Sequence, residues 1–186
     1  MTYRNPTHET IGSDILAVLH TLKFPDQVLG EAWVARLRSL EPTQWYPIET
    51  LLELLQALAK KAGHASVVQM GRQLFRDSHQ KRLTPDLKSG GDVVFGIDAM
   101  YHHANRGKDL GGWKVMRFAP GVAVLRKTTP HHCALEEGIL HEALHTVGTE
   151  ALIVQSACMQ RGDAHCEFEI RSSVRDERWL GGHPLI

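Results

Sequence analysis

Apolar side chains recur at helical spacing through the first half of the chain. Pro25 separates two such segments, and Pro47 suits the first turn of another, which Gly63 ends. The predicted helices cover residues 11–24, 26–40, 47–63 and 66–83. The stretch that follows, residues 84–91, combines proline, serine and glycine and is the best candidate boundary within the chain.

Beyond this boundary the hydrophobic period changes. Residues 92–105 still predict a helix, whereas the segments on either side of Pro120-Gly121 predict a β-hairpin. A helix over 133–147 and a second hairpin follow. The predicted strands are residues 113–118, 122–126, 152–159 and 165–171. The pattern predicts an α+β fold, in which a helical N-terminal half packs on a hairpin-helix-hairpin unit with a four-stranded antiparallel sheet.

The length of 186 residues suits one compact domain, with 1–84 as a helical subdomain and 92–186 as an α+β ligand-binding subdomain. Lysine plus arginine equal aspartate plus glutamate at 21 each, so no net field attracts nucleic acid or an acidic membrane. The N-terminus lacks the apolar core of a signal peptide, and no later run is long enough to span a membrane. We therefore expect a cytoplasmic protein, whose three cysteines are thiols that pack, bind metal or respond to redox state.

The segment CMQRGDAHCEFEI, residues 158–170, places two of these cysteines in neighbouring strands. If residues 161–163 form a short loop around a left-handed glycine, Cys158 lies directly opposite Cys166. Alternation along the strand then separates an apolar face from a polar one. The apolar face continues with Phe168 and Ile170, and the polar face carries His165, Glu167 and Glu169.

This Cys-x7-Cys pattern, with Gly-Asp in its loop and Phe-x-Ile after it, resembles the C-terminal signature of the vinyl-4-reductase ligand-binding domains. Such domains occur in chlorophyll-synthesis proteins and phenol-responsive transcription activators. The preceding helix and strand also resemble the family, at Gly138, Ile139, Leu140, Leu144, Gly148, Val154 and Cys158. In the first half, Glu31-Ala-Trp33, Trp45-Tyr46-Pro47 and Gly71-Arg-Gln resemble an uncharacterised myxobacterial family with the same signature.

The resemblance implies a non-catalytic sensory domain that binds an apolar, aromatic or tetrapyrrole-like ligand, forms a homodimer and signals through a partner protein. It also implies a zinc ion, which the phenol-responsive members hold with three cysteines and one glutamate. Cys133, Cys158 and Cys166 match the cysteines, whereas the position of the glutamate holds Gln155, a poorer zinc ligand. Two alternatives stay open: a nearby histidine completes the site, or the cysteines are buried, reduced and metal-free. The histidines concerned are His131, His132 and His165.

A second metal motif lies in HEALHTVG, residues 141–148, which contains the zinc-protease pattern H-E-x-x-H. His141 and His145 are one helical turn apart and able to reach one ion, with Glu142 placed to activate its water. The third histidine of the longer protease pattern is missing, because Ala151 stands at its position. A zinc hydrolase is therefore an alternative function, and the competing interpretation is the solvated face of an amphipathic helix.

We expect the ligand to enter an apolar pocket between the helices and the sheet. Binding would reorder the helix that starts at Cys133 and the C-terminal hairpin. The expected lining consists of Trp45, Tyr46, Phe95, Met100, His102, Met116 and Leu144. His102 or His103 is also a candidate axial ligand for haem, although the Tyr-x-Ser-x-Arg clamp of the related haem nitric-oxide-binding domains is absent. A further alternative is a structural adaptor whose pocket is filled by its own side chains.

Overall fold

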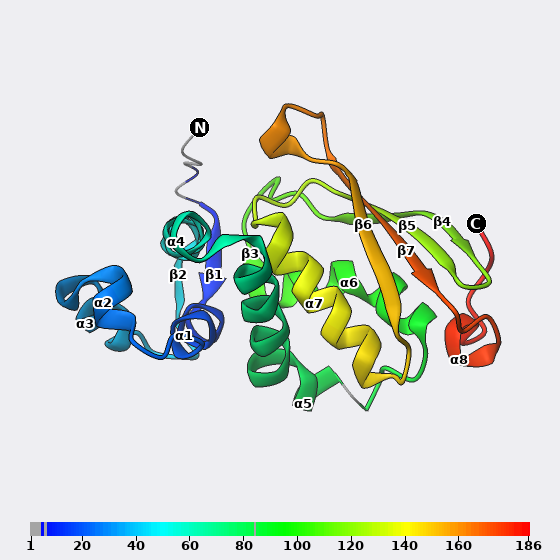
Figure 1. The fold of residues 1–186 in the computed structure, drawn as a ribbon, viewed down its shortest axis with the longest axis horizontal. Coiled ribbons are helices and arrows are strands. Elements are labelled where there is room, and N and C mark those ends of the chain that lie inside the picture. The colour runs from blue at the N-terminus through cyan, green and yellow to red at the C-terminus, as the bar shows by residue number, and fades with distance from the viewer. Residues whose placement is uncertain (1–4, 6, 84) are drawn as a thin grey trace.

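The computed structural model describes residues 5, 7–83 and 85–186. Figure 1 shows a helical N-terminal half beside a half in which helices pack on a β-sheet. The first helices are α1 (Gly12–His20), α2 (Pro25–Leu29) and α3 (Glu31–Arg38). The single helix predicted over 26–40 is broken at Gly30, because its φ of 89° lies outside the helical region and is accessible to glycine at little cost.

The long helix α4 (Ile48–Leu74) changes direction at Gly63, where φ is 77° and ψ is 173°. The helix end predicted at this glycine is therefore a bend between two helical segments. The second segment continues into a π-helical turn, η1 (Phe75–Gln80), and the short α5 (Lys81–Leu83). Among the described residues, no helix has both the length and the apolar character needed to cross a lipid bilayer.

A small antiparallel sheet joins segments that are distant in the sequence. Its strands are β1 (Glu9–Ile11), β2 (Trp45–Pro47) and β3 (Asn105–Arg106), in the order β2-β1-β3. The sequence pattern predicts none of them, because two or three residues are too few to show alternation. The sheet places the guanidinium of Arg106 over the ring of Trp45, at 4.4 Å from its centroid.

The larger sheet has the four antiparallel strands that the pattern predicts. β4 (Trp113–Ala119) and β5 (Val122–Lys127) form one hairpin, and β6 (Ala151–Ala157) and β7 (Cys166–Ser172) form the other. The order is β4-β5-β7-β6, so each hairpin contributes one central strand and one edge strand. One face of the sheet is buried through Phe118, Leu125, Phe168 and Ile170. The predicted α+β fold is confirmed.

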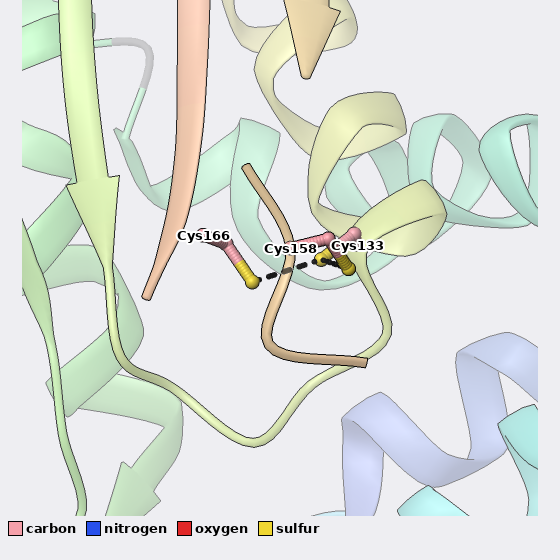
Figure 2. Close-up of side chains that lie close together, drawn as sticks. All are labelled: Cys133, Cys158 and Cys166. Atoms are coloured by element: carbon pink, nitrogen blue, oxygen red, sulfur yellow. Dashed lines mark hydrogen bonds between the residues drawn. The ribbon is translucent and has the colours of Figure 1, made fainter. Parts of the chain in front are cut away.

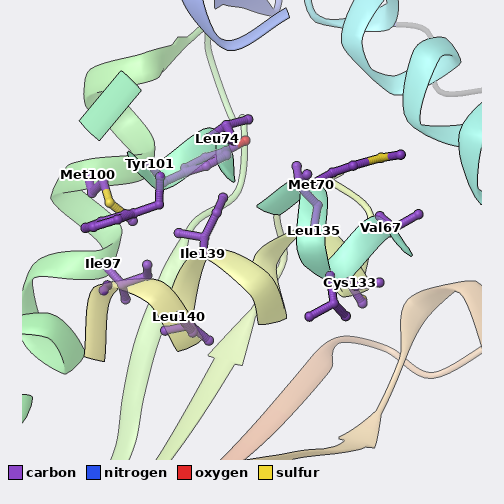
Figure 3. Packing of buried hydrophobic residues seen from close by; sticks show 14 of the residues in the cluster. Val67, Met70, Leu74, Ile97, Met100, Tyr101, Cys133, Leu135, Ile139 and Leu140 are labelled. Carbon is purple, nitrogen blue, oxygen red and sulfur yellow. The ribbon is translucent and has the colours of Figure 1, made fainter. Parts of the chain in front are cut away.

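Helices α6 (Gly90–Ala104) and α7 (Cys133–Thr146) lie against the larger sheet, and α7 also packs on the second segment of α4 (Figure 1). Figure 3 shows apolar side chains of α4, α6 and α7 filling the space between these helices. The residues in contact around α7 include Leu74, Ile97, Met100, Tyr101, Ile139 and Leu140. One continuous hydrophobic core therefore runs through both halves of the chain.

Two glycines permit the close approach of α4 and α7. A Cβ atom at Gly71 would lie 2.0 Å from the carbonyl oxygen of Leu135, and one at Gly138 would lie 2.0 Å from the carbonyl oxygen of Val68. Neither backbone oxygen belongs to a flexible side chain that could turn away. The helix crossing therefore requires glycine at both positions.

The C-terminal segment folds back over the edge of the larger sheet. Helix α8 (Glu177–Leu180) buries Trp179, whose ring stacks on that of Phe118 and whose indole N–H donates to a carbonyl of β4 at 2.8 Å. Ile186 exchanges two backbone hydrogen bonds with Phe118. These contacts hold His183, which lies between α8 and Ile186 in the sequence, against helix α6.

Candidate ligand groove and thiol cluster

Three cysteine side chains meet where α7 begins and the second hairpin turns (Figure 2). The sulfur of Cys133 lies 3.3 Å from that of Cys166 and 3.7 Å from that of Cys158, and all three sulfurs lie within 4.8 Å of one another. All three side chains are buried free thiols. The structure thus brings together the three cysteines that the sequence suggested as a group, here called the thiol cluster.

The loop of the second hairpin differs from the predicted three-residue loop but keeps the expected register. The pairing of β6 with β7, extended by one residue, sets Cys158 opposite Cys166. Between them the chain forms a 3-10 turn, η2 (Met159–Arg161), and Gly162 adopts the left-handed conformation at φ 97°. The carboxylate of Asp163 accepts a hydrogen bond from the backbone N–H of Cys158 at 2.7 Å, which closes the loop and fixes the position of that thiol.

The thiols of the cluster differ in acidity. The hydrogen bond from Cys133 lowers the pKa of Cys166 to about 7, assisted by the backbone N–H of Met159 and the ammonium of Lys127 and opposed by burial. The same thiol–thiol hydrogen bond, together with burial, raises the pKa of Cys133. Of Cys133 and Cys166, the second therefore becomes a thiolate, the form that binds metal ions, more readily.

The sulfur positions fit a thiophilic metal ion. Tetrahedral zinc with Zn–S bonds of about 2.3 Å separates its sulfur ligands by about 3.8 Å. The measured separations of 3.3 and 3.7 Å are close to this value. No histidine, aspartate or glutamate in the described part of the chain joins the cluster. None of the histidines proposed as the fourth ligand, His131, His132 and His165, is therefore in place.

Gln155, which stands where the family resemblance places a glutamate, is directed at the cluster. The side chain of Gln155 acts to lower the pKa of Cys133, although the pKa as a whole is raised. Its buried amide nitrogen has no hydrogen-bond partner within the described residues. The carbonyl oxygen of this amide, or a water molecule, is the candidate fourth donor.

A buried ion pair supports the start of α7 beside the thiols. Lys127 is fully buried, donates to the carbonyl of His131 at 2.7 Å and lies 3.8 Å from the carboxylate of Glu136. Burial alone would raise the pKa of Glu136, but Lys127, His131 and the hydroxyl of Thr129 outweigh it, so this pKa is lowered. A positive charge and its counter-ion are thus fixed next to the thiol cluster, where Lys127 acts to lower the pKa of both Cys133 and Cys166.

The H-E-x-x-H segment does not form a metal site. Glu142 is 5% exposed and pairs with two arginines, Arg76 at 2.8 Å and Arg72 at 3.5 Å. His145 pairs instead with Glu150 at 2.7 Å, and the pKa of His141 is lowered by burial and by Arg72. These guanidinium groups neutralise the carboxylate that would activate water and oppose the binding of a cation. The predicted solvated face is also only partly present, because Glu142 is buried and anchors α7 to α4 while His145 is exposed.

A groove of about 530 Å³ runs along helix α6. One wall comes from α5 and the loop after it, and another from α7 and the C-terminal segment. Its apolar lining includes Leu83, Leu87, Phe95, Ile97, Met100 and Ala143. Its polar side chains are Arg82, Asp86, Asp92, His103 and His183. This cavity, called the α6 groove below, combines an apolar lining with a few polar side chains, as small-molecule sites do.

One end of the α6 groove is fixed by His183. Its ring stacks on Phe95 at a centroid distance of 4.7 Å and an angle of 10°, and its Nε2 lies 2.8 Å from Asp92. Asp92 also accepts hydrogen bonds from the Ser89 hydroxyl and the Lys88 backbone N–H. Although burial acts to raise the pKa of Asp92, these hydrogen bonds lower it. The carboxylate is therefore fully used in holding the C-terminal segment and the start of α6.

The structure brings only part of the predicted ligand-binding set together. Phe95 and Met100 line the α6 groove. The other predicted positions lie outside the groove. Trp45 and Tyr46 belong to the small sheet, Met116 lies on β4 and Leu144 lies in the core. His102 is paired with Asp98 at 3.6 Å. His103, one residue further along α6, faces the groove instead of His102, because one residue turns a helix by about 100°.

Several groove residues carried no signal in the sequence. Arg82 and Asp86 come from a segment that reads as a helix end and a loop, and His183 lies in a tail without periodicity. His103, by contrast, was named from the sequence as a candidate haem ligand. These side chains converge because the C-terminal segment folds back on α6, which no local pattern records.

The fold is similar to that of H-NOX proteins. An H-NOX protein from S. oneidensis has a TM-score of 0.67 at 18% identity, covering 90% of this chain and 98% of that chain. An H-NOX protein from K. algicida has a TM-score of 0.65 at 13% identity, covering 88% and 96%. An oxygen-binding H-NOX domain related to soluble guanylate cyclases has a TM-score of 0.62 at 10% identity, covering 88% and 93%. At these identities the similarity concerns the fold alone.

Within this fold, residues 118–172 match the family model of the V4R domain. The match extends from β4 to the end of β7 and includes α7 and all three cysteines. It confirms the resemblance to the vinyl-4-reductase domains. No curated protein matches the chain.

Proposed function

We propose that the protein is a non-catalytic sensor domain that binds a small apolar or aromatic molecule in the α6 groove. The observation that carries the proposal is the groove itself, whose volume of about 530 Å³ suits a drug-sized ligand. Its lining combines an apolar surface with a few polar side chains, as is typical of small-molecule sites. The V4R match and the H-NOX-like fold support a sensor of small molecules or gases.

Helix α7 connects the groove with the thiol cluster. Ala143 lines the groove, and Cys133, at the first position of the same helix, belongs to the cluster. Ile139 and Leu140, between them, pack in the core that also contains Ile97 and Met100 of α6 (Figure 3). Suppose that α7 has two placements against its neighbours. A ligand that has a higher affinity for the protein with one placement shifts the equilibrium toward that placement, by an amount set by the difference in affinity. The change then reaches the second hairpin through the thiols.

The thiol cluster is proposed as a structural zinc site. Zinc has no redox chemistry and would join the start of α7 to the second hairpin through Cys133, Cys158 and Cys166. The sulfur separations and the lowered pKa of Cys166 support this role. Lys127 supplies positive charge near the three thiolates that the metal requires.

A homodimer is proposed as the signalling form. Strand β6 lies at an edge of the larger sheet and exposes two apolar side chains, Leu152 at 61% and Val154 at 44%. Unprotected apolar edge strands favour pairing with another chain. A second copy bound at β6 would sense any movement of the second hairpin and transmit it to a partner protein.

The proposal is tested by native mass spectrometry of the protein purified from its own host. Subunit number, bound metal and a retained small molecule are read in one spectrum. The matched variant is Ala99→Trp, which fills the α6 groove from an exposed position of α6 without touching the core. We expect a small molecule on the natural protein and none on the variant. A molecule retained equally by both would place the ligand elsewhere and refute the groove.

Haem binding is a second candidate because the imidazole of His103 faces the groove beside Arg82. An axial imidazole and a cation for a propionate are two of the groups that haem needs. The similar S. oneidensis and K. algicida proteins are described in Fe(II) states. Haem-supplied protein should then show a Soret band that His103→Ala removes and His102→Ala keeps. Absence of the band in the natural protein would exclude this function.

A further inference from the structure

The α6 groove is longer than it is wide, and its two ends differ in charge. Asp92, Gly96, Ala99 and His103 follow one another along α6 at helical spacing, and all line the groove. At 1.5 Å per residue, the groove extends about 16 Å from Asp92 to His103. An elongated molecule therefore fits it better than a compact one.

The end at Asp92 is electrically satisfied. Its carboxylate accepts hydrogen bonds from Ser89 and Lys88 and is paired with His183, so both of its oxygens are already used. Phe95 and its stacked partner His183 offer a flat apolar surface at this end. This half of the groove suits the apolar part of a ligand.

The opposite end carries two cationic or potentially cationic groups with no partner. Within the described residues, neither the guanidinium of Arg82 nor the imidazole of His103 takes part in a hydrogen bond or an ion pair. The two are close, since partial burial and then Arg82 lower the pKa of His103. The carboxylate of Asp14, 3.5 Å from His79, acts to raise the pKa of His103 and is the smallest of the contributions to it. This end of the groove therefore presents the guanidinium of Arg82 and the imidazole of His103, neither of which is paired among the described residues.

The carboxylate of Asp86 also lines the groove, and it limits where an anion can sit. Arg82 is among the groups that shift the pKa of His103, whereas Asp86 is not. An anionic group is therefore favoured between Arg82 and His103 and disfavoured near Asp86. A single head group at the His103 end satisfies both conditions.

We propose that the ligand of the α6 groove is an elongated amphiphile, with an apolar or aromatic body against Phe95 and Met100 and one carboxylate or sulfonate between Arg82 and His103. This inference rests on the proposed function and specifies the chemical class of its ligand. The guanidinium of Arg82 donates to the anionic oxygens, and His103 donates as well once the anion has raised its affinity for a proton. A neutral molecule of the same shape gains only the apolar contacts.

The test compares two fluorescent probes of similar shape, anilinonaphthalene sulfonate, which is anionic, and phenylnaphthylamine, which is neutral. Each is titrated into the full chain at low salt, pH 7.5. The variants are Arg82→Gln and His103→Gln, with Arg36→Gln as the matched control, since Arg36 is exposed on α3 and far from the groove lining. Thermal unfolding of each variant shows that it is folded.

We expect both probes to bind the natural protein. Arg82→Gln should lower the affinity for the anionic probe about tenfold or more, because a charge-assisted hydrogen bond is lost. His103→Gln should lower this affinity less. Neither of these two variants should change the affinity for the neutral probe more than about twofold. The control Arg36→Gln should leave the affinity for both probes unchanged. Added salt should weaken the anionic probe selectively.

Two negative results have different meanings. If Arg82→Gln leaves the preference between the probes unchanged while Ala99→Trp abolishes the binding of both, the groove binds a neutral ligand and the anionic head is refuted. If Ala99→Trp leaves both probes bound, or neither probe binds the natural protein, the groove is not a ligand site and the proposed function fails with it.

Discussion

The thiol cluster and the α6 groove share helix α7 but are built in opposite ways. The cluster is buried and closed, and its members come from the start of one helix and the turn of one hairpin. The groove is open, and its walls come from α5, α6, α7 and the C-terminal segment. A closed cluster holds elements in place, whereas an open groove leaves room for a molecule. Substitutions in the two regions should therefore change different properties: stability and metal content in one, ligand affinity in the other.

The largest effect is expected beside the cluster, at Glu136. Glu136→Gln leaves the fully buried ammonium of Lys127 without its counter-charge, which costs about 3–5 kcal/mol of unfolding free energy. The control is Glu137→Gln on the same helix, whose carboxylate pairs with the exposed His64 and should cost less than about 1 kcal/mol. Urea denaturation at neutral pH measures both. A loss at Glu136 no larger than at Glu137 would show that the buried pair is not structural.

The destabilisation caused by Glu136→Gln should depend on pH. Because the folded-state pKa of Glu136 is lowered, its carboxylate contributes stability above its ordinary value near 4.5, and this contribution is lost as the pH falls through the folded-state pKa. The difference in unfolding free energy between the natural protein and Glu136→Gln should therefore shrink below pH 4.5. A difference that grew on acidification would mean that the sign of the shift is wrong.

The second effect is a loss of stability at the point where α7 crosses α4. Gly138→Ala places a methyl group 2.0 Å from the Val68 carbonyl and should cost about 1–3 kcal/mol, because the helices must move apart. Gly96→Ala is the control, since its nearest neighbour, a Leu87 methyl group, is 4.0 Å away. That change should stabilise α6 by up to about 1 kcal/mol through helix propensity. Equal thermal midpoints for the two variants would contradict the close crossing.

The third effect is stabilisation by zinc, which should depend on the thiol cluster and not on the groove. Zinc at about one hundred times its dissociation constant should add about 2.7 kcal/mol to the unfolding free energy, and Cys158→Ser should lose it. Gln155→Glu should bind zinc more tightly, since it restores a carboxylate, and His165→Ala should retain it, since His165 lies outside the cluster. Elemental analysis and thermal unfolding report these outcomes. If Ala99→Trp in the groove lowered zinc content as Cys158→Ser does, the two regions would not be separate.

The smallest effect is expected at the outer wall of the groove. His183→Ala removes the ring stacked on Phe95 and the bond to Asp92, in a partly exposed setting, and should cost about 1 kcal/mol or less. His145→Ala removes a fully exposed pair with Glu150 and should change nothing measurable. Chemical denaturation of both variants checks the difference. A larger loss at His145 than at His183 would contradict the role of the C-terminal segment as a wall.

Local patterns were sufficient for the hairpins and for two members of the thiol cluster, whereas the third, Cys133, was assigned through the family resemblance. The alternation along β7 and the glycine in its loop place Cys158 opposite Cys166, and helical periodicity begins at Cys133. They were insufficient for the small sheet, whose short strands lack a period, and for the histidine that faces the groove. Choosing between His102 and His103 requires the rotation of α6 against its neighbours, which depends on packing.

The sequence by itself determined the α+β fold, the two hairpins and the placement of Cys158 opposite Cys166, because each follows from the spacing of residues along a strand or helix. That Cys133 joins these two thiols was implied only by the family resemblance. Only the tertiary structure decided that Glu142 binds Arg72 and Arg76, so that H-E-x-x-H is no metal site. It also decided where the groove lies, through the return of the C-terminal segment onto α6. The physical reason is that burial and pairing between distant segments depend on how whole elements pack, and local periodicity contains no information about that packing.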